Sequence, residues 1–347
     1  MIPAKAYAAL DPKTPLQPFS FDRRDLRSDD VQVKIHFCGV CHSDIHQARD
    51  EWGGSIYPMV PGHEIIGEVV ATGSEVTKFK TGDLVGVGVM VDSCCSCKNC
   101  NNDQEQYCNE GMTGTYNAME RDGVTIAQGG YSSQIVVKER FVLHISKKID
   151  PAAAAPLLCA GITTYSPLRF AGVKAGQKVA VVGLGGLGHM GVKFAVSFGA
   201  EVTVISTSPG KAEDAKKLGA HHFLLSTDKA AMQKHASHFD VILDTVSANH
   251  DYTFLLDLLD IEGKLLIVGL PSKEPNLSPF SLITKRRSII GSMIGGMKET
   301  QEMLDYCAEK NIVSDVEVIP VGYINEAYER MIRSDVKYRF VIDMATL

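Results

Sequence analysis

The patterns of a strand, a glycine-rich turn and a helix follow one another from residue 178. The segment KVAVVGLGGLGHMGVKFA places Gly183, Gly185 and Gly188 in a G-x-G-x-x-G pattern directly after a β-branched run. In this context the first glycine allows a tight turn, the second lets a pyrophosphate approach the backbone, and the third lets helix and strand pack closely. Strand and helix patterns alternate after it. The sequence therefore predicts a doubly wound parallel sheet that binds a dinucleotide.

The end of the next predicted strand indicates which dinucleotide binds. In EVTVISTSPGK, Ser206, Thr207 and Ser208 stand where an NAD-binding strand usually carries a carboxylate, and Lys211 follows them. A carboxylate there would bind the ribose 2′-hydroxyl and repel a 2′-phosphate. Hydroxyl and amine donors favour the phosphate, so we predict NADPH. The alternative is a serine-rich turn followed by a solvated lysine.

The first 150 residues have a different pattern, because short β-branched runs alternate with Gly, Pro and Asp turns. Such runs predict strands. The expected strands cover residues 31–37, 64–73, 83–91 and 132–140, and a last one covers residues 338–344 after a helical stretch. A chain of 347 residues is long enough for two domains. We therefore expect a β-rich part and a parallel-sheet part.

Four cysteines in the segment DSCCSCKNCNNDQEQYC have the spacing of a metal site. They are Cys94, Cys97, Cys100 and Cys108. Four thiolates at these intervals can enclose one Zn²⁺ tetrahedrally with no open position, which makes such a site structural. We interpret Cys95 as a non-ligand. An iron–sulfur site is a weaker alternative, because the spacing departs from ferredoxin patterns.

A second group of possible ligands is spread over distant segments. CGVCHSDIHQ contains Cys38, Cys41, His42, Ser43, Asp44 and His46, PGHEIIG contains His63 and Glu64, and APLLCAGITTY contains Cys159 as a candidate third ligand. Two cysteines and one histidine would leave the fourth zinc position open, as a catalytic site requires. Spacing alone does not bring the three residues together.

Composition limits the partners and the compartment. The net charge of −6 does not favour a nucleic-acid partner. The N-terminal residues lack the apolar core of a signal peptide, and no run of about 18 apolar residues suggests a membrane span. We therefore expect a cytoplasmic protein, in which nine cysteines are better interpreted as thiols and metal ligands than as disulfides.

The order of these motifs resembles that of the zinc-dependent medium-chain alcohol dehydrogenases. GVCHSD, PGHEIIGEVV, the four-cysteine loop, LLCAGITTY and the glycine motif follow one another as in that family, nearly from end to end. GTYN, GGYS, GLGGLGHM, GSMIGG and KYRFVID are closest to the cinnamyl alcohol dehydrogenase branch and its bacterial aldehyde reductases. The resemblance implies an α/β fold, with a GroES-like catalytic domain of residues 1–152 and 296–347 and a Rossmann domain of residues 153–295.

The resemblance also assigns roles at the catalytic centre. It implies that Cys41, His63 and Cys159 bind a catalytic zinc ion, so that each chain holds two zinc ions. Glu64 matches a carboxylate that can approach the metal, and Asp44 matches a residue that orients the ligand histidine. Ser43 and His46 would pass the substrate proton to water. A surface histidine and a turn-forming aspartate are the alternatives for His46 and Asp44.

Further contacts follow from the resemblance alone. Cofactor contacts are expected from His42, Thr163, Gly186, Leu187, Val268, Gly269, Ser292, Ile294 and Arg339, in addition to the glycines and donors named above. Arg339 would reach the pyrophosphate, with an edge-strand surface residue as the alternative. An apolar substrate pocket is expected from Trp52, Met90, Met112, Tyr116 and Met293, which could equally be core residues.

The expected activity is the interconversion of primary alcohols and aldehydes, mainly aldehyde reduction, in a homodimer. Two alternatives are a zinc-free quinone reductase of the same superfamily and a non-catalytic NADPH-binding protein. The first would lack the metal ligands, and the second would have lost part of the ligand set or of the proton relay. The seven ligand positions, Ser43 and His46 are all filled.

Overall fold

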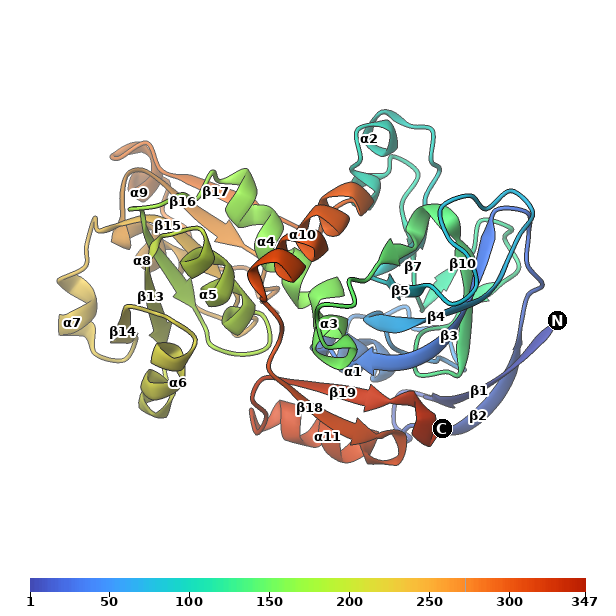
Figure 1. The fold of residues 1–347 in the computed structure, drawn as a ribbon. Helices are drawn as coiled ribbons and strands as arrows, with labels where there is room; N and C mark the ends of the chain where they lie inside the picture. The colour runs from blue at the N-terminus through green and yellow to red at the C-terminus, as the bar shows by residue number, and fades with distance from the viewer. Residues whose placement is uncertain (272) are drawn as a thin grey trace. The chain divides into compact units, whose positions relative to one another are not determined.

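A computed structural model describes residues 1–271 and 273–347. The chain folds into two compact units, which we treat separately (Figure 1). Unit 1 comprises Met1–Cys159 and Gly295–Leu347, and unit 2 comprises Ala160–Ile294. The division thus falls after Cys159 and after Ile294, whereas the sequence-based boundaries lie after residues 152 and 295. The difference places Cys159 in unit 1, with the other metal-ligand candidates.

Unit 1 is built around a seven-stranded, mostly antiparallel sheet. Its strands follow the order β11-β5-β4-β3-β19-β18, and β10 also pairs with β3. These strands are β3 (Asp30–Gly39), β4 (Ile65–Thr72), β5 (Leu84–Val87), β10 (Gln134–Lys138), β11 (Leu143–His144), β18 (Val316–Pro320) and β19 (Arg339–Asp343). Burial largely alternates along β3, as expected for a strand with one face on the core.

Small ribbons and helices complete unit 1. The ribbons are β1 (Ile2–Ala8) with β2 (Gln17–Arg23), β6 (Met90–Asp92) with β7 (Thr113–Gly114), and β8 (Ala118–Met119) with β9 (Ile126–Ala127). The helices are α1 (His42–Ala48), α2 (Lys98–Asn101), α3 (Pro151–Ala154), α10 (Met297–Lys310) and α11 (Ile324–Ile332). The single strand expected over residues 83–91 is two strands, because β5 pairs in the main sheet while β6 pairs with β7.

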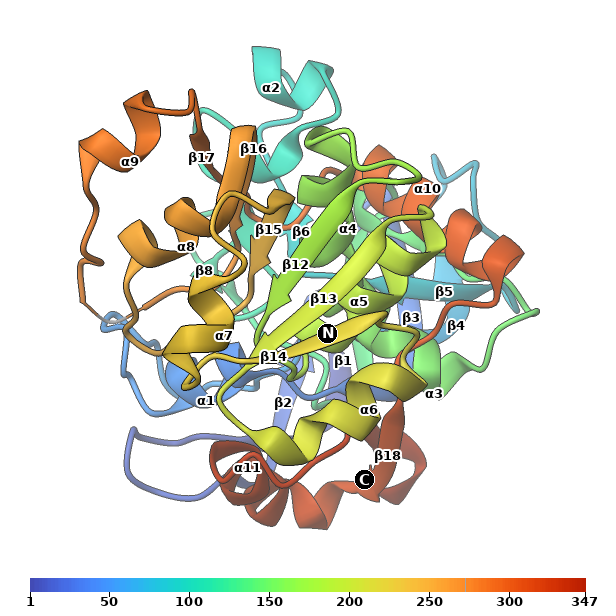
Figure 2. The same cartoon turned by 90° about the vertical axis from the view of Figure 1, so that its left-hand side faces the viewer.

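Unit 2 is a six-stranded parallel sheet in the order β14-β13-β12-β15-β16-β17 (Figure 2). The strands are β12 (Lys178–Val182), β13 (Glu201–Ser206), β14 (His222–Leu225), β15 (Phe239–Asp244), β16 (Leu259–Ile267) and β17 (Ser288–Gly291). The helices are α4 (Ala160–Phe170), α5 (Gly188–Ser197), α6 (Ala212–Lys217), α7 (Lys229–Gln233), α8 (Tyr252–Leu258) and α9 (Pro279–Ile283). The strand order reverses between β12 and β15, which is where such sheets bind ligands.

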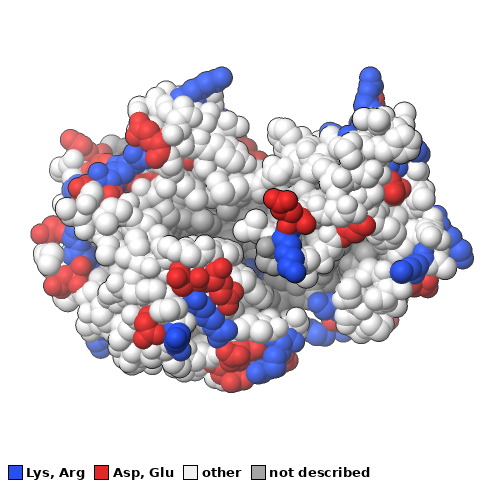
Figure 3. All heavy atoms as spheres, turned by 180° about the vertical axis from the view of Figure 1, so that it is seen from behind, with Lys and Arg blue, Asp and Glu red and all other residues white. Residues whose placement is uncertain are grey.

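The surface carries mixed charge. On the face drawn in Figure 3, acidic and basic side chains are interspersed among neutral ones. Among the residues that the structure describes, no helix has the length and apolar character needed to span a membrane.

Candidate metal centres and active site

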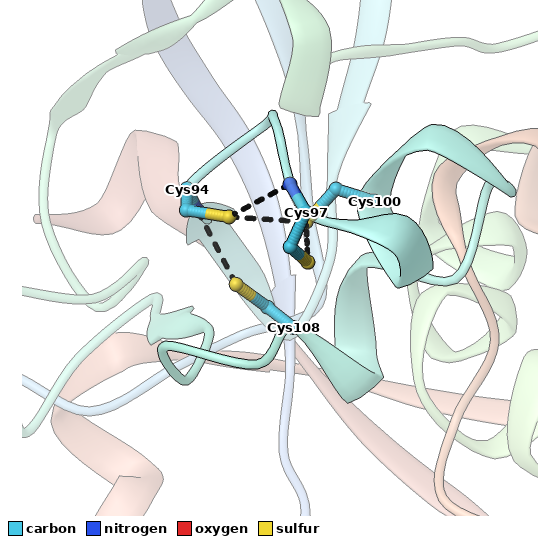
Figure 4. A group of neighbouring side chains, drawn as sticks. All are labelled: Cys94, Cys97, Cys100 and Cys108. Carbon is cyan, nitrogen blue, oxygen red and sulfur yellow. Dashed lines mark hydrogen bonds between the residues drawn. The ribbon is translucent and has the colours of Figure 1, made fainter.

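The four-cysteine segment forms a compact lobe whose sulfurs point toward one another (Figure 4). The Sγ atoms of Cys94, Cys97, Cys100 and Cys108 all lie within 4.8 Å of one another. Each sulfur has a polar partner at 3.3–3.5 Å. Three sulfurs accept a backbone N–H: Cys94 Sγ from Cys97, Cys97 Sγ from Asn109, and Cys108 Sγ from Cys94. The fourth, Cys100 Sγ, contacts Ser93 Oγ. Such donors favour the thiolate form, which binds metal. The backbone N–H groups of Ser96 and Cys97 lower the pKa of Cys94 to about 6.

Cys95 lies outside this group of sulfurs. Its backbone is left-handed, with φ of +57°, and its thiol lies 3.5 Å from Ser93 Oγ. The thiol of Cys95 therefore does not join the four converging sulfurs.

The lobe is anchored to the rest of unit 1 by an ion pair between the partly exposed Arg140 and the buried Glu105. The Arg140 guanidinium donates to the carbonyl oxygen of Cys100 at 2.7 Å and to Glu105 Oε1 at 2.9 Å. The other oxygen of Glu105 accepts the Met297 N–H at 3.1 Å, at the start of α10. The lobe is thus connected to a helix almost two hundred residues further along the chain. Sequence reasoning missed this connection, because the ligand spacing of the four-cysteine segment concerns only its cysteines and does not indicate that Glu105 pairs with Arg140.

The second group of ligand atoms converges because two strands of the main sheet are paired. β3 and β4 run antiparallel with Cys38 opposite Ile65, so the residue that follows β3 meets those that precede β4. Cys41, His63, Glu64 and Cys159 offer ligand atoms that all lie within 4.8 Å of one another, and all four residues are buried. Two sulfurs and one imidazole nitrogen are donors that Zn²⁺ prefers.

Asp44 holds this group in place. Its Oδ1 accepts the Gly62 N–H at 3.1 Å and lies 3.1 Å from His63 Nδ1, while its Oδ2 accepts the Cys41 N–H at 2.9 Å and the Tyr131 hydroxyl at 3.1 Å. The contact with Nδ1 leaves Nε2 of His63 as the nitrogen available to a metal. Tyr131 lies in the GGYS motif, but the sequence did not identify it as a partner of Asp44.

The electrostatics of the group are those of a metal centre. A hydrogen bond between Cys159 and Cys41 lowers the pKa of Cys41 well below its usual value and raises that of Cys159 well above it. Cys41 is therefore the thiol of the pair that loses its proton first. Burial works against the charge of His63, but Asp44 and Cys41 outweigh it and raise the pKa of His63 well above its usual value. A divalent cation would displace these protons and neutralise the thiolates.

Glu64 and Arg339 form a buried ion pair beside the sulfurs. Burial raises the pKa of Glu64 to about 7. Among the described residues, Glu64 Oε2 has no hydrogen-bond partner, so one carboxylate oxygen is free to act as a ligand. The pairing with Glu64 was not expected for Arg339, and contact of Arg339 with a pyrophosphate stays a prediction. The residues present thus fit a zinc ion at Cys41, His63 and Cys159.

We expect Asp44→Asn to weaken zinc binding at this group by about 10- to 100-fold, because His63 loses the anion that orients it. Titration of the bound zinc with a chromophoric chelator measures the change. Asp30→Asn is the matched control, because Asp30 is also buried but pairs with Arg24 instead. Equal zinc affinity in the Asp44 variant and the control would contradict the role of Asp44.

The expected proton relay lies on α1. Ser43 Oγ lies 3.7 Å from Cys41 Sγ, and His46 is half-buried with its Nδ1 hydrogen-bonded to Glu51. The indole of Trp52 stacks on His46 with the ring centroids 4.9 Å apart. The exposed His42 lies on the same helix. Ser43 thus lies at the metal group and His46 toward solvent. The sequence did not identify Glu51 as a partner of His46.

The residues expected to line a substrate pocket lie in different surroundings. Tyr116 is buried with its ring stacked 5.8 Å from the His63 ring, which places it beside the metal group. Met90 is buried in β6, Met112 is half-buried, and Met293 belongs to unit 2. Trp52 is about half exposed, at 48%, although it stacks on His46. Tyr116 is therefore the pocket candidate with a direct contact to the metal group.

Apart from His42 and Arg339, which belong to unit 1, the expected dinucleotide residues lie in unit 2, most of them directly after strands of the parallel sheet. The glycine loop from Gly183 to Gly188 joins β12 to α5, and Lys211 Nζ donates to the carbonyl oxygen of Leu184 in that loop at 2.8 Å. Ser206 ends β13, and Thr207 and Ser208 follow it, both exposed. Val268 and Gly269 follow β16, and Ser292 and Ile294 follow β17. Thr163 lies on α4.

These parts define a class of protein. One chain contains both a parallel sheet with a dinucleotide-binding loop and a group of thiols and an imidazole that suits a metal. This combination is typical of a metal-dependent dehydrogenase.

Comparison with known proteins gives the family. Residues 27–147 match the alcohol dehydrogenase GroES-like domain, and residues 186–309 match the zinc-binding dehydrogenase family. The chain is 54% identical to the aldehyde reductase YahK of Escherichia coli, with 99% of each chain covered. It is also 54% identical to the NADP-dependent alcohol dehydrogenase C 1 of Mycolicibacterium smegmatis, over 100% of this chain and 99% of that one.

Solved structures agree with this assignment. A cinnamyl alcohol dehydrogenase from Sorghum bicolor superposes with a TM-score of 0.96 at 45% identity, covering 99% of this chain and 98% of that one. The Helicobacter pylori enzyme complexed with NADP(H) gives 0.93 at 42% identity, with 99% of each chain covered. The chain belongs to the zinc-dependent medium-chain alcohol dehydrogenases, in the branch that contains the cinnamyl alcohol dehydrogenases.

Proposed function

We propose that this protein interconverts primary alcohols and aldehydes with NADP(H), and that it acts mainly as an aldehyde reductase. Its substrates are aromatic aldehydes such as cinnamaldehyde and benzaldehyde, together with aliphatic aldehydes of medium length. The observation that carries the proposal is the convergence of Cys41, His63 and Cys159 in one buried group. A protein that only bound NADPH would have no use for that group.

The chain's own residues have distinct tasks in this reaction. Cys41, His63 and Cys159 would hold a zinc ion, which when bound supplies a Lewis acid for the carbonyl oxygen, while NADPH supplies the hydride. Ser43 would donate a hydrogen bond to the oxygen of the substrate. His46 would exchange the proton with water, and Glu51 would hold its ring in place. Asp44 keeps His63 in the orientation that binding requires.

Unit 2 would bind NADPH. The loop from Gly183 to Gly188 would take the pyrophosphate at the start of α5, where backbone N–H groups are free for phosphate. Ser206, Thr207, Ser208 and Lys211 would bind the 2′-phosphate. Lys211 lies over the glycine loop through its bond to Leu184, which supports an ammonium group near the adenosine ribose.

The double variant Ser208→Asp with Lys211→Ala should move the cofactor preference toward NADH. The new carboxylate would repel the 2′-phosphate and accept the 2′-hydroxyl, so we expect the ratio of kcat/KM for NADPH over NADH to fall by about 100-fold or more. Initial rates with both cofactors measure the ratio. Lys217→Ala is a matched control, because Lys217 ends α6 in the same unit. An unchanged ratio would contradict the phosphate assignment.

The reaction itself is tested by following NADPH absorbance at about 340 nm with cinnamaldehyde, benzaldehyde and hexanal. We expect oxidation of NADPH with all three and a lower rate with NADH. A protein that binds NADPH but oxidises it with none of them would contradict the proposal, and turnover of quinones alone would favour a quinone reductase.

We further propose that the enzyme is a homodimer in a reducing compartment such as the cytoplasm. β17 is the last strand of the six-stranded sheet, and Phe280 and Ile283 just before it are about 70% exposed. An open strand edge beside apolar side chains suits association with a second copy. All nine cysteines are free thiols, which suits a reducing compartment. Light scattering on the purified protein would test the dimer, and the mass of a single chain would refute it.

A further inference from the structure

A buried carboxylate lies at the point where the strand order of unit 2 reverses. Asp244 ends β15, next to β12, and its side chain is fully buried. Its Oδ1 accepts the Val246 N–H at 3.1 Å, and its backbone carbonyl oxygen accepts the N–H groups of Val268 and Gly269 at 3.1 and 3.2 Å. Asp244 therefore connects the loop after β15 with the loop after β16.

The second carboxylate oxygen of Asp244 faces His250. His250 Nε2 lies 2.8 Å from Asp244 Oδ2, and His250 Nδ1 lies 2.7 Å from the carbonyl oxygen of Ala248. Each neighbour is an acceptor. A neutral imidazole has only one N–H, so it can satisfy only one of them. Beside an ionised Asp244 carboxylate, the geometry therefore favours the doubly protonated ring.

The charged groups around His250 agree with this preference. The hydrogen bond that His250 donates to Asp244 raises the pKa of His250 above its usual value. Burial opposes the rise, and the Ala248 carbonyl and the charges of Asp244 and Asp251 support it. The ring of Tyr252 lies 5.1 Å from that of His250. Among the residues that the structure describes, Asp244, Asp251 and Tyr252 are thus the titratable groups that face it, from β15 and from the start of α8.

The loop that His250 closes is in contact with the glycine loop. Thr245 Oγ1 donates to the carbonyl oxygen of Val182 at 2.8 Å. Gly183 has a φ of +89°, and a Cβ atom there would lie 2.9 Å from Thr245 Oγ1 and 2.9 Å from Val246 Cγ2. A Cβ atom at Gly269 would collide with the backbone of Val246. Residues 245–246 therefore fix the position of the first glycine of the phosphate loop.

We propose that His250 is a positioning residue for the dinucleotide: its protonated ring ties residues 245–250 to Asp244, and cofactor binding weakens when the ring loses its proton. This inference rests on the proposed function, because it assumes that the glycine loop binds NADPH. His250 itself does not touch the reacting atoms.

The direction of the pH dependence of NADPH binding follows from the number of N–H donors on the His250 ring. Below the pKa of His250, the ring donates to both acceptors and holds residues 245–250 against Asp244. As pH rises through this raised pKa, one N–H is lost, and a lone pair then faces an acceptor. The hydrogen bond between His250 and Asp244, and with it the stronger binding of NADPH, is therefore present at low pH and lost at high pH.

The test is the Kd of NADPH for the zinc-loaded protein, measured by NADPH fluorescence without aldehyde between pH 6 and pH 9. We compare wild type with His250→Gln. Between pH 6 and pH 9, the Kd of wild type should increase by a factor about five times larger than the factor for the variant. The reason is that only wild type loses the hydrogen bond of His250 over this range. At pH 6 the variant should bind about fivefold more weakly than wild type. The comparison cancels the titration of the NADPH phosphate and of Lys211, which are common to both proteins.

His222→Gln is the matched control. His222 also pairs with a carboxylate, Glu201, at 2.7 Å, but these residues begin β14 and β13, at the edge of the sheet opposite the glycine loop. The control should follow the wild-type profile.

Asp244→Asn provides a second variant, in case His250→Gln folds poorly. An asparagine amide can accept from Val246 and donate to the unprotonated Nε2 of His250, which leaves Nδ1–H for Ala248. In this variant the contact between residue 244 and His250 needs the neutral ring. The affinity for NADPH should therefore be retained at pH 9 and weaken toward pH 6, which is the reverse of wild type.

Parallel profiles for wild type, His250→Gln and Asp244→Asn would overturn the inference and leave the proposed function standing. If the wild-type protein bound no NADPH at any pH, the proposed function and the inference would fail together.

Discussion

Cys159→Ser is expected to abolish turnover and to lower the zinc content from about two ions per chain to about one. The reason is that Cys159 Sγ lies 4.0 Å from Cys41 Sγ and completes the two-sulfur, one-nitrogen donor set. A serine hydroxyl is a poor zinc ligand beside a thiolate. Loss of several kcal/mol of charge stabilisation corresponds to a fall in kcat/KM of about 10³-fold or more.

NADPH binding should survive in this variant, because the glycine loop and the phosphate donors belong to unit 2. Metal analysis, initial rates and NADPH fluorescence on one preparation separate the three effects. Cys307→Ala is the matched control, since Cys307 is a buried cysteine of unit 1 whose thiol contacts Met303. Wild-type turnover with two zinc ions in Cys159→Ser would remove Cys159 from the metal centre.

Cys100→Ser is expected to release the other zinc ion and to unfold the lobe. Four thiolates hold a segment that has little apolar core of its own, so the metal supplies its folding free energy. The Arg140 and Glu105 contacts that lead to the start of α10 would loosen with it. We expect Tm to fall by on the order of 10 °C and protease cleavage to begin within residues 94–110.

Cys95→Ser is the control for this experiment. Cys95 is adjacent in sequence, but its sulfur lies outside the converging group. Its variant should keep two zinc ions and the wild-type Tm. If Cys100→Ser kept its zinc and its resistance to protease, the four sulfurs would not form a metal site.

The parts of the site that depend on local spacing were accessible from the sequence. Cys94, Cys97, Cys100 and Cys108 lie within fifteen residues, so one short loop can bring them together. The glycine motif likewise joins a strand to a helix, as the alternating pattern after residue 178 predicts. The family follows from the order of the motifs, and the comparisons confirm it.

The parts that depend on long-range packing were not accessible. Cys41 and Cys159 are separated by 118 positions, and only the sheet and the turns before Cys159 bring them together. The pairing of Glu64 with Arg339 spans 275 positions and depends on β19 lying beside β3. The strand expected at residues 83–91 is divided because β5 pairs with β4 whereas β6 pairs with β7. The spacing of apolar residues does not indicate which strand a segment pairs with. His250 was missed because its partner, Asp244, is recognisable only from burial.

The dependence of NADPH oxidation on bound zinc tests the proposed function most directly. The rate with cinnamaldehyde is measured before chelator dialysis, after it, and after zinc is restored, while NADPH fluorescence is recorded at each stage. Turnover should be lost with the metal and return with it, while NADPH stays bound throughout. Full turnover by protein that metal analysis shows to be free of zinc would contradict the proposed function.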